Sequence, residues 1–477
     1  MIDARYALIT TIGLGIAHMC MYAGYRTGSL IVEPMLHSVH DRRPEEMDED
    51  AGFYGEAIMN GFNMVGHIVA PAFLLLINAK WSMMIGSVAF TLSFAAYTLM
   101  NQYVIYVSRA VLGLIGAAFN AGQSLYIMQI STPLSIEKIN GLEWALGTGL
   151  STLLGGCIYI PMMLLDPNTD TTSSANLEYS DGQIRLIFGA FTVIGIISNV
   201  IFCFLPNRPV ANSISSDAAV VEKRKNKTIL SSLGLTLQSF FDPTVLQLTP
   251  HFLYVGWQNF VWLATYPTAL QFTGSLSQDV LLPAFYGILF SLGSLLMGLL
   301  TAPLSRRITR FGQTPCLILA ACLQLLCGIL IVLSTPNRST IEPNTDPSLL
   351  ISPNVPIALA MGFLFGLLDG CNNTNRTVIC ASALPGRKDE IFGISRFYQA
   401  LAGTVLLVCS PMLPMYWNLA IEAVLFIVGA AFYLRVCSVV NKRQQFAQSE
   451  TDTSTLPEDS GSIASIIKEV DSNGNHI

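Results

Sequence analysis

Apolar stretches of about 20 residues or more alternate with short polar segments along most of the chain. A helix of that length crosses the hydrocarbon core of a bilayer, so the pattern predicts an all-α integral membrane protein with twelve transmembrane helices. Pro411, Pro414 and the interfacial pair Tyr416 and Trp417 separate the last two stretches. The predicted spans are residues 7–31, 54–78, 81–100, 103–130, 140–165, 184–205, 246–270, 280–304, 313–334, 355–380, 391–413 and 416–437.

The tenth predicted span, residues 355–380, turns polar halfway along. Asp369, Asn372, Asn373 and Arg376 are spaced i, i+3, i+4 and i+7, which places them on one face of a helix. A carboxylate in the middle of a membrane helix costs about 3 kcal/mol on insertion scales, so it faces protein or a water-filled cavity. We interpret this stripe as a functional site; the alternative is a structural clasp, in which Asp369 only fastens the helix to a neighbour.

Similar polar stripes occur in four further places, and most of them have a structural alternative. His18 and His251 are hydrogen-bonded packing residues or proton carriers. Arg109 either extends to the membrane surface or binds an anionic group. The tyrosines pack in the core or line a cavity. The stripes are His18, Tyr22, Tyr25 and Arg26 in the first span; Glu56, Asn60, Asn63 and His67 in the second; Arg109, Asn120 and Gln123 in the fourth; and His251, Tyr254 and Gln258 in the seventh.

Composition excludes several classes of protein. Only 12% of the 477 residues are charged, against about 25% in soluble domains, and 52% are hydrophobic. The net charge of −6 gives no footprint for nucleic acid. The ten cysteines lie in or beside apolar spans, so we expect neither a disulfide framework nor a metal site. Nucleotide-binding, hydrolase and metalloprotease motifs are absent, so we expect no enzyme and no cofactor.

The distribution of Lys and Arg predicts the orientation. Most of the 25 basic residues lie on one side if both termini are cytosolic, and the predicted outer side holds only Arg42, Arg43, Arg185 and Arg338. We therefore expect a six-span half at 1–205, a basic cytosolic linker at 206–244, a second six-span half at 245–437 and a disordered acidic tail at 438–477. Asn337, in the pattern Asn-Arg-Ser, is a candidate N-glycosylation site on the outer side.

Six spans, a basic central loop and six further spans are the layout of the major facilitator fold, whose two halves are related by an axis along the membrane normal. In that fold the first, fourth, seventh and tenth spans line a central cavity, and here all four carry polar stripes. Arg376, Arg396 and Glu143 lie toward the predicted cytosolic end, where ion pairs among them would lock a gate.

Particular segments resemble the uncoordinated-93-like family, a branch of the major facilitator superfamily. The family's second, fourth, fifth, tenth and eleventh spans are similar to Gly52–Ile58, Leu112–Ala118, Asn140–Ala145, Gly366–Asn373 and Phe392–Gln399. On this resemblance Asp369 and Gln399 stand at family positions, and Gln399 joins the candidate gate residues. One departure concerns the superfamily's inner loop signature, because Ser305 stands where an acidic residue is expected.

The resemblance implies a transporter-like protein that modulates a potassium channel or another membrane partner, such as a receptor. The alternative is a secondary transporter that carries a small polar or ionic solute through the central cavity by alternating access. In the first case the outer faces of the spans bind the partner, and in the second Asp369 holds a cation or a proton. We expect a multi-pass protein of the plasma membrane or of an endolysosomal membrane, with the lipid bilayer as its surroundings.

Overall fold

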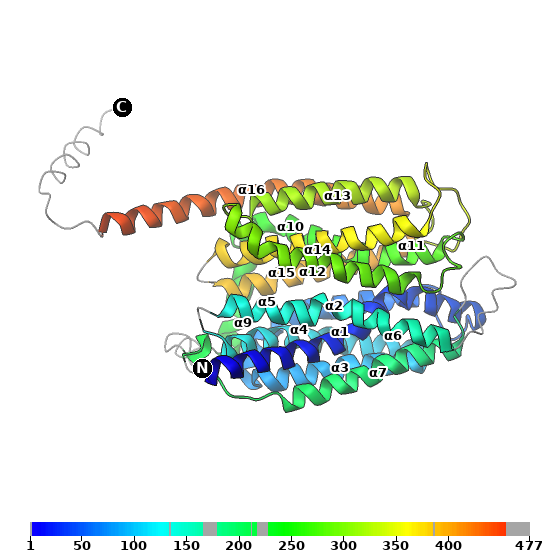
Figure 1. Ribbon diagram of the computed structural model, residues 1–477, viewed down its shortest axis with the longest axis horizontal. Coiled ribbons are helices and arrows are strands. Elements are labelled where there is room, and N and C mark those ends of the chain that lie inside the picture. Colours follow the sequence, from blue (N-terminus) through cyan, green and yellow to red (C-terminus); the bar gives the residue numbers. More distant parts are fainter. Residues whose placement is uncertain are drawn as a thin grey trace, which may run out of the picture.

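The structure is a computed structural model that describes residues 2–132, 135–165, 179–210, 212–216, 228–384 and 387–454 (Figure 1). Its first half contains α1 (Ile2–Arg42), α2 (Ala51–Leu76), α3 (Ala79–Thr98), α4 (Gln102–Ile130), α5 (Ile136–Trp144), the π-helix η1 (Ala145–Gly149), α6 (Ser151–Leu165) and α7 (Asp181–Phe204). The turn η2 (Ile214–Ser216) and α9 (Ile229–Phe240) follow.

The second half contains α10 (Pro243–Phe260), the π-helix η3 (Val261–Thr265), α11 (Tyr266–Phe272), α12 (Leu282–Arg307), α13 (Thr314–Ser334), α14 (Val355–Ala383), α15 (Lys388–Cys409), the turn η5 (Ser410–Met412) and α16 (Met415–Ser454). Prolines help to set the breaks between these helices. For example, Pro411 lies in η5 and Pro414 precedes α16, so the predicted division between the last two spans is confirmed.

Nine helices in the described part of the chain are long and apolar enough to cross a membrane. Helical segments also cover the other three predicted spans, in α2, α3 and the rod made by α10, η3 and α11. These three are not among the nine. An all-helical membrane fold is therefore established, while the count of twelve spans stays a prediction.

The two halves pack side by side along their lengths, with residues up to 204 in the lower part of Figure 1 and the helices from α10 onward in the upper part. The halves meet where α2 packs against α15 and where α6 packs against α12. Equivalent pairings recur in each half, because α2 contacts α4 as α12 contacts α14, and α3 contacts α4 as α13 contacts α14. The fold is thus built from two similar helical bundles.

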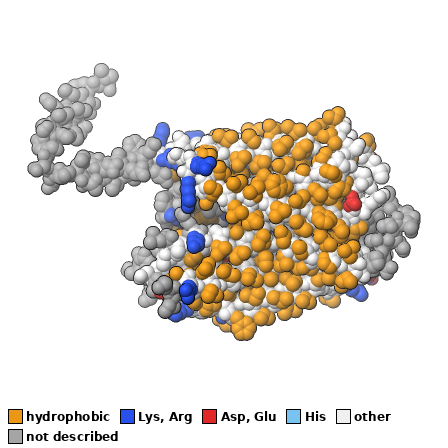
Figure 2. Space-filling view, in the orientation of Figure 1, with side chains coloured by type: hydrophobic (Ala, Val, Ile, Leu, Met, Phe, Trp, Pro, Cys, Tyr) orange, Lys and Arg blue, Asp and Glu red, His pale blue; other side chains and the backbone are white. Residues whose placement is uncertain are grey.

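The surface of the bundle matches a membrane protein. Figure 2 shows a broad apolar belt and a concentration of Lys and Arg side chains at the end where the N-terminus lies in Figure 1. Exposed large side chains such as Ile9, Phe204 and Leu300 would be unfavourable in water but are suited to lipid.

Two expectations need correction or completion. The segment 438–454 was predicted to be disordered, but α16 continues through it to Ser454, because residues 438–454 contain neither glycine nor proline. The remainder of the predicted tail lies outside the described residues. The predicted linker contains the helix α9, which starts with a capping box at Thr228 and packs against α2 and α15.

Candidate functional site

Arg109 is neither extended to the membrane surface nor free to bind a ligand. Its guanidinium forms an ion pair with the carboxylate of Glu56 on α2, and each of these two side chains is only 2% exposed. Ser29 on α1 donates a hydrogen bond of 2.8 Å to Oε1 of Glu56. The rings of Tyr25 and Tyr97 lie about Arg109, with centroids 5.9 Å from Cζ. These contacts tie α1, α2 and α4 together in the core of the first half.

A second buried cluster joins α1, α4 and α5. Nδ1 of His18 lies 2.7 Å from Oε1 of Glu143, and Gln123 donates a hydrogen bond of 2.6 Å to the same oxygen. The ring of Tyr22 packs on His18 with a centroid distance of 4.2 Å. Glu143 therefore pairs with His18 rather than with Arg376 or Arg396, and this structure does not contain the ion pairs expected for a cytosolic gate.

The polar residues of α10 form a network inside the second half. Tyr254 donates a hydrogen bond of 3.0 Å to Gln324 on α13, while Nδ2 of Asn372 donates to Tyr254 and to Gln258, both at 3.3 Å. His251 has no hydrogen-bond partner among the described residues and packs instead against the ring of Tyr433, at 4.6 Å. The structure therefore favours a packing role for His251.

The predicted stripe on α14 contacts several different neighbours. Asn373 donates a hydrogen bond of 3.1 Å to the carboxylate of Asp369, one turn earlier on the same helix, while Asn372 faces α10. Nη1 of Arg376 donates to Ser395 on α15 at 3.3 Å. Oδ2 of Asp369 has no hydrogen-bond partner in the described chain, although the residue is only 4% exposed. Asp369 is therefore a buried carboxylate whose second oxygen remains available to a further partner.

Charged side chains from both halves meet around Asp369. Arg26 on α1, Arg376 on α14 and Arg396 on α15 all act electrostatically on its carboxylate. The guanidinium of Arg26 lies 5.5 Å from the ring centroid of Trp262, and its Nη1 is buried without a partner among the described residues. Arg396 contacts Gln399 at 3.4 Å, the other candidate gate residue that the resemblance indicated. This central cluster is defined as Arg26, Asp369, Arg376 and Arg396.

One end of the bundle is closed by contacts between the halves. Gln271 on α11 donates a hydrogen bond of 3.0 Å to the carbonyl of Leu30 on α1 and accepts one of 2.9 Å from Tyr179. Tyr159 on α6 bonds to the hydroxyl of Tyr179 at 3.0 Å and donates to the carbonyl of Val280 at 3.1 Å. We call Tyr159, Tyr179 and Gln271 the latch.

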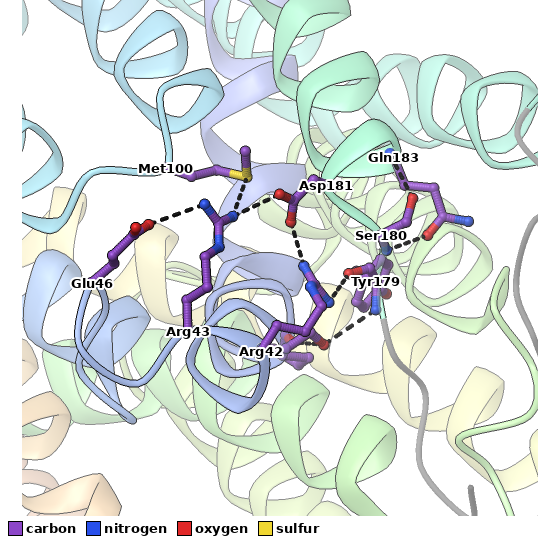
Figure 3. Close-up of polar contacts among 10 residues, drawn as sticks. Arg42, Arg43, Glu46, Met100, Tyr179, Ser180, Asp181 and Gln183 are labelled. Carbon is purple, nitrogen blue, oxygen red and sulfur yellow. Dashed lines mark hydrogen bonds and ion pairs between the residues drawn. The ribbon is translucent and has the colours of Figure 1, made fainter. Parts of the chain in front are cut away.

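A further cluster of charges braces the latch within the first half (Figure 3). Arg42 donates hydrogen bonds of 2.6 Å to the carbonyl of Tyr179 and to Asp181. Arg43 contacts the other oxygen of Asp181 at 2.6 Å and Glu46 at 3.0 Å. The short segment that carries Tyr179 is therefore held between the end of α1 and the start of α7.

Some residues around the central cluster are accessible on the side opposite the latch. Arg396 is an exposed residue even though Tyr22, Arg26 and Asp369 lie within electrostatic range of it. On α4, a methyl group added at Gly116 would meet no atom within 4 Å, and Asn120 is only partly buried. On this side of the central cluster, Arg396 and Asn120 thus remain at least partly accessible.

A separate apolar recess of about 580 Å³ lies between α2, α4 and α15, away from the central cluster. Phe62, Val65 and Val408 line it, with Asp48 and Tyr106 at its polar rim. Tyr106 donates a hydrogen bond of 2.9 Å to Asp48. None of the predicted cavity residues lines this recess, so it is distinct from the candidate site.

Two features of the site could not be read from the sequence. The latch residues lie near helix ends, where no periodic polar pattern marks them. Glu422 on α16 stands alone in an apolar span, yet it is 1% exposed and acts electrostatically on Tyr254.

The side chain of Asn337, the candidate glycosylation residue, is engaged in the structure, since its Oδ1 accepts a hydrogen bond of 3.0 Å from the backbone of Tyr416.

Comparison with known proteins agrees with the fold. The model of the ion channel regulatory protein UNC-93 family matches residues 43–434. The UNC93-like protein MFSD11 of Xenopus laevis is 24% identical over 442 residues, which cover 90% of this chain and 96% of that protein. Its counterpart in Xenopus tropicalis is also 24% identical, over 453 residues, with 92% and 98% covered.

Solved structures of transporters share the architecture at low sequence identity. A mutant of the peptide transporter POT has a TM-score of 0.63 and 13% identity, covering 91% of this chain and 95% of its own. The D-xylose-proton symporter has a TM-score of 0.60 and 12% identity, with 90% and 97% covered. A bacterial homolog of the human lysosomal transporter Spinster, in an inward-facing and unoccupied conformation, has a TM-score of 0.59 and 12% identity, with 92% and 98% covered. These likenesses establish the major facilitator fold and no more.

Proposed function

Because the chain belongs to the UNC-93 family and has the fold of major facilitator transporters, we propose that it is a secondary transporter of a small ionic solute. The observation that carries the proposal is the central cluster, in which Arg26 of the first half faces Asp369 and Arg396 of the second. Charged groups inside a membrane bundle are costly and mark solute or ion pathways. A site shared by two rigid bundles is also the arrangement that alternating access requires.

We further propose that a water-filled cleft leads to the central cluster from the end opposite the latch, and that the transport cycle uses this cleft and the latch. In this structure the latch holds the halves together at one end, while Arg396 is exposed toward the other. Rocking of the halves about the central cluster would break the hydrogen bonds of Gln271 to Leu30 and Tyr179 and close the cleft. With the orientation predicted from Lys and Arg, the latch is extracellular or lumenal and the cleft is cytosolic.

A second candidate function is regulation of an ion channel or another membrane partner, and the description of the matching family favours it. In that case the lipid-facing surfaces of the helices would bind the partner, and the central cluster would serve stability alone. Ser305, in place of the expected acidic residue of the inner loop, is consistent with this alternative. A potassium channel subunit is the partner type that the resemblance implies.

The two proposals predict different behaviour of the purified protein. Solutes of each charge class are added to the wild type and to Asp369→Asn, and the midpoint of thermal unfolding is followed. A ligand at 100 times its Kd should stabilise the wild type by about 2.7 kcal/mol. The transporter proposal expects that at least one solute stabilises the wild type and that Asp369→Asn changes this stabilisation. If no solute stabilises the wild type and Asp369→Asn only lowers stability, the transporter proposal is wrong, and the regulatory candidate should be tested by co-purification with channel subunits.

A further inference from the structure

The charges of the central cluster do not balance. Arg26, Arg376 and Arg396 form no ion pair with a carboxylate within the described chain, whereas Arg109 has Glu56 as its partner. Asp369 is the carboxylate that acts on both Arg376 and Arg396, and Arg26 acts on Asp369 in turn. Three guanidinium groups therefore share one carboxylate.

This excess charge cannot be removed by proton loss, because a guanidinium stays protonated in proteins. Arg376 is only 5% exposed, and its Nε lacks a hydrogen-bond partner among the described residues. Buried charge without a partner is unfavourable, so a negative group from outside the chain would stabilise this site. In this conformation the positive charge of the site therefore exceeds the negative charge that the chain supplies.

The geometry also indicates which part of the cluster receives this group. Arg26 is held against the stacked rings of Trp262 and Phe290, with Cζ 5.5 and 5.9 Å from their centroids. Arg376 is engaged with Ser395 and lies 6.0 Å from the ring of Phe392. Arg396 is exposed, and its hydrogen bond within the described chain is a long one of 3.4 Å to Gln399. Arg26 and Arg396, one from each half, are thus the two groups available to an incoming ligand.

We propose that the solute is a small oxyanion, a carboxylate or a phosphate, which Arg26 and Arg396 bind together from opposite halves. This inference rests on the proposed transport function and names its substrate class. The planar guanidinium fork matches carboxylate and phosphate oxygens and can form two parallel hydrogen bonds with them. Arg376 contributes positive charge behind the pair, and Asp369 limits the excess charge when no solute is bound.

The same arrangement couples the charge of the solute to closure of the cleft. Arg26 and Arg396 carry like charges and lie within electrostatic range of each other, so they resist approach of the halves. An oxyanion between them replaces this repulsion with two attractions. A neutral solute leaves the repulsion in place, and a cation adds to it. The site therefore selects against both classes at the closing step as well as at binding.

Binding is tested on the full-length protein in lipid nanodiscs, at constant ionic strength. The probes are inorganic phosphate, succinate, lactate, glucose and choline, and binding is measured by calorimetry and by the midpoint of thermal unfolding. Comparison of succinate and lactate with phosphate distinguishes a carboxylate solute from a phosphate solute. The variants are Arg26→Gln, Arg396→Gln and Arg396→Lys, and the control is Arg338→Gln, which removes an exposed arginine from the far loop.

We expect at least one of the three anions to bind the wild type, with Arg26→Gln and Arg396→Gln each weakening that binding tenfold or more. Arg396→Lys should retain part of the affinity, since it keeps the charge without the fork, and Arg338→Gln should bind normally. Because Arg396 is exposed, its substitution should leave the fold intact, and its unfolding midpoint without ligand checks this.

Two results would overturn the inference in distinguishable ways. If glucose or choline binds and the anions do not, or if both glutamine variants bind the anion as the wild type does, the oxyanion assignment is wrong while transport remains supported. If none of the five probes binds the wild type, the oxyanion assignment is also wrong. If the broader panel used with Asp369→Asn is also without effect, the proposed transport function fails as well.

Discussion

Arg109→Gln should destabilise the protein strongly, because it breaks a buried ion pair from one side. Arg109 and Glu56 are each 2% exposed, and the carboxylate retains only the hydrogen bond of 2.8 Å from Ser29 once the guanidinium is gone. Removing one partner of a buried pair costs about 3–5 kcal/mol, since it leaves an uncompensated charge in the interior. Polar contacts between membrane helices average about 0.6 kcal/mol, so the expected loss lies well above that background.

A double-mutant cycle separates this cost from the general effect of substitution. Glu56→Gln combined with Arg109→Gln removes both charges, and the double variant should be more stable than Arg109→Gln alone. The matched control is Arg338→Gln, which breaks the exposed pair between Arg338 and Glu342. That pair is open to solvent, so its loss should cost at most about 0.5 kcal/mol.

The assay is reversible unfolding of the purified protein in mixed detergent micelles, followed by circular dichroism as the fraction of denaturing detergent rises. The unfolding free energies of the wild type, the two single variants, the double variant and the control complete the cycle. The reasoning would be refuted if Arg109→Gln cost less than about 1 kcal/mol, the range of an exposed pair. It would also fail if the double variant lost the sum of the two single effects, because the charges would then be independent.

Three further experiments test separate parts of the structure. Gly366→Ala should lower the unfolding midpoint, because the new Cβ would lie 2.1 Å from a carbonyl oxygen of α12, whereas Gly116→Ala has open space and should be tolerated. Tyr179→Phe removes the hydroxyl that donates to Gln271, so a cysteine introduced at position 280 should react faster with a water-soluble maleimide; an unchanged rate would argue against the latch. Asn337→Gln should leave the electrophoretic mobility of the untreated protein unchanged, since the Asn337 amide is engaged by the backbone of α16 and Ser339 is buried; a faster-migrating variant, or a deglycosidase-dependent shift of the wild type that the variant lacks, would show that the site is glycosylated.

Much of the fold could be predicted from the sequence because hydropathy and helical periodicity are local properties. The break between α15 and α16 was predicted from two prolines and an interfacial aromatic pair, and the structure confirms it. The polar stripes of α1, α4, α10 and α14 also lie on helices as predicted. Helix ends were less predictable: α16 extends beyond the predicted span, since nothing in residues 438–454 forces a helix to stop.

The partners of the site residues could not be predicted, because they come from helices far apart in the sequence. Spacing placed Asn372 and Asn373 together on α14, but Asn372 contacts Gln258 while Asn373 contacts Asp369. The sequence left Arg109 available for a ligand, but in the structure it forms an ion pair with Glu56 on α2. A helical stripe indicates which face is polar, and the packing of other helices decides which of its members remain available.

The excess charge at the centre shows this limit most clearly. The sequence places Arg26, Arg109, Arg376 and Arg396 in the spans, together with at least as many carboxylates, so a count alone predicts a neutral interior. The structure assigns those carboxylates unevenly. They are Glu56, paired with Arg109; Glu143, paired with His18; Glu422, near Tyr254; and Asp369.

Only Asp369 among these carboxylates faces the remaining three arginines, and the positive centre follows from that distribution. Glu422 acts electrostatically on Tyr254, and the three arginines form no ion pair with it in the described chain. Three arginines from both halves thus have Asp369 as their shared carboxylate, and this uneven distribution is the strongest structural reason to regard the central cluster as a binding site.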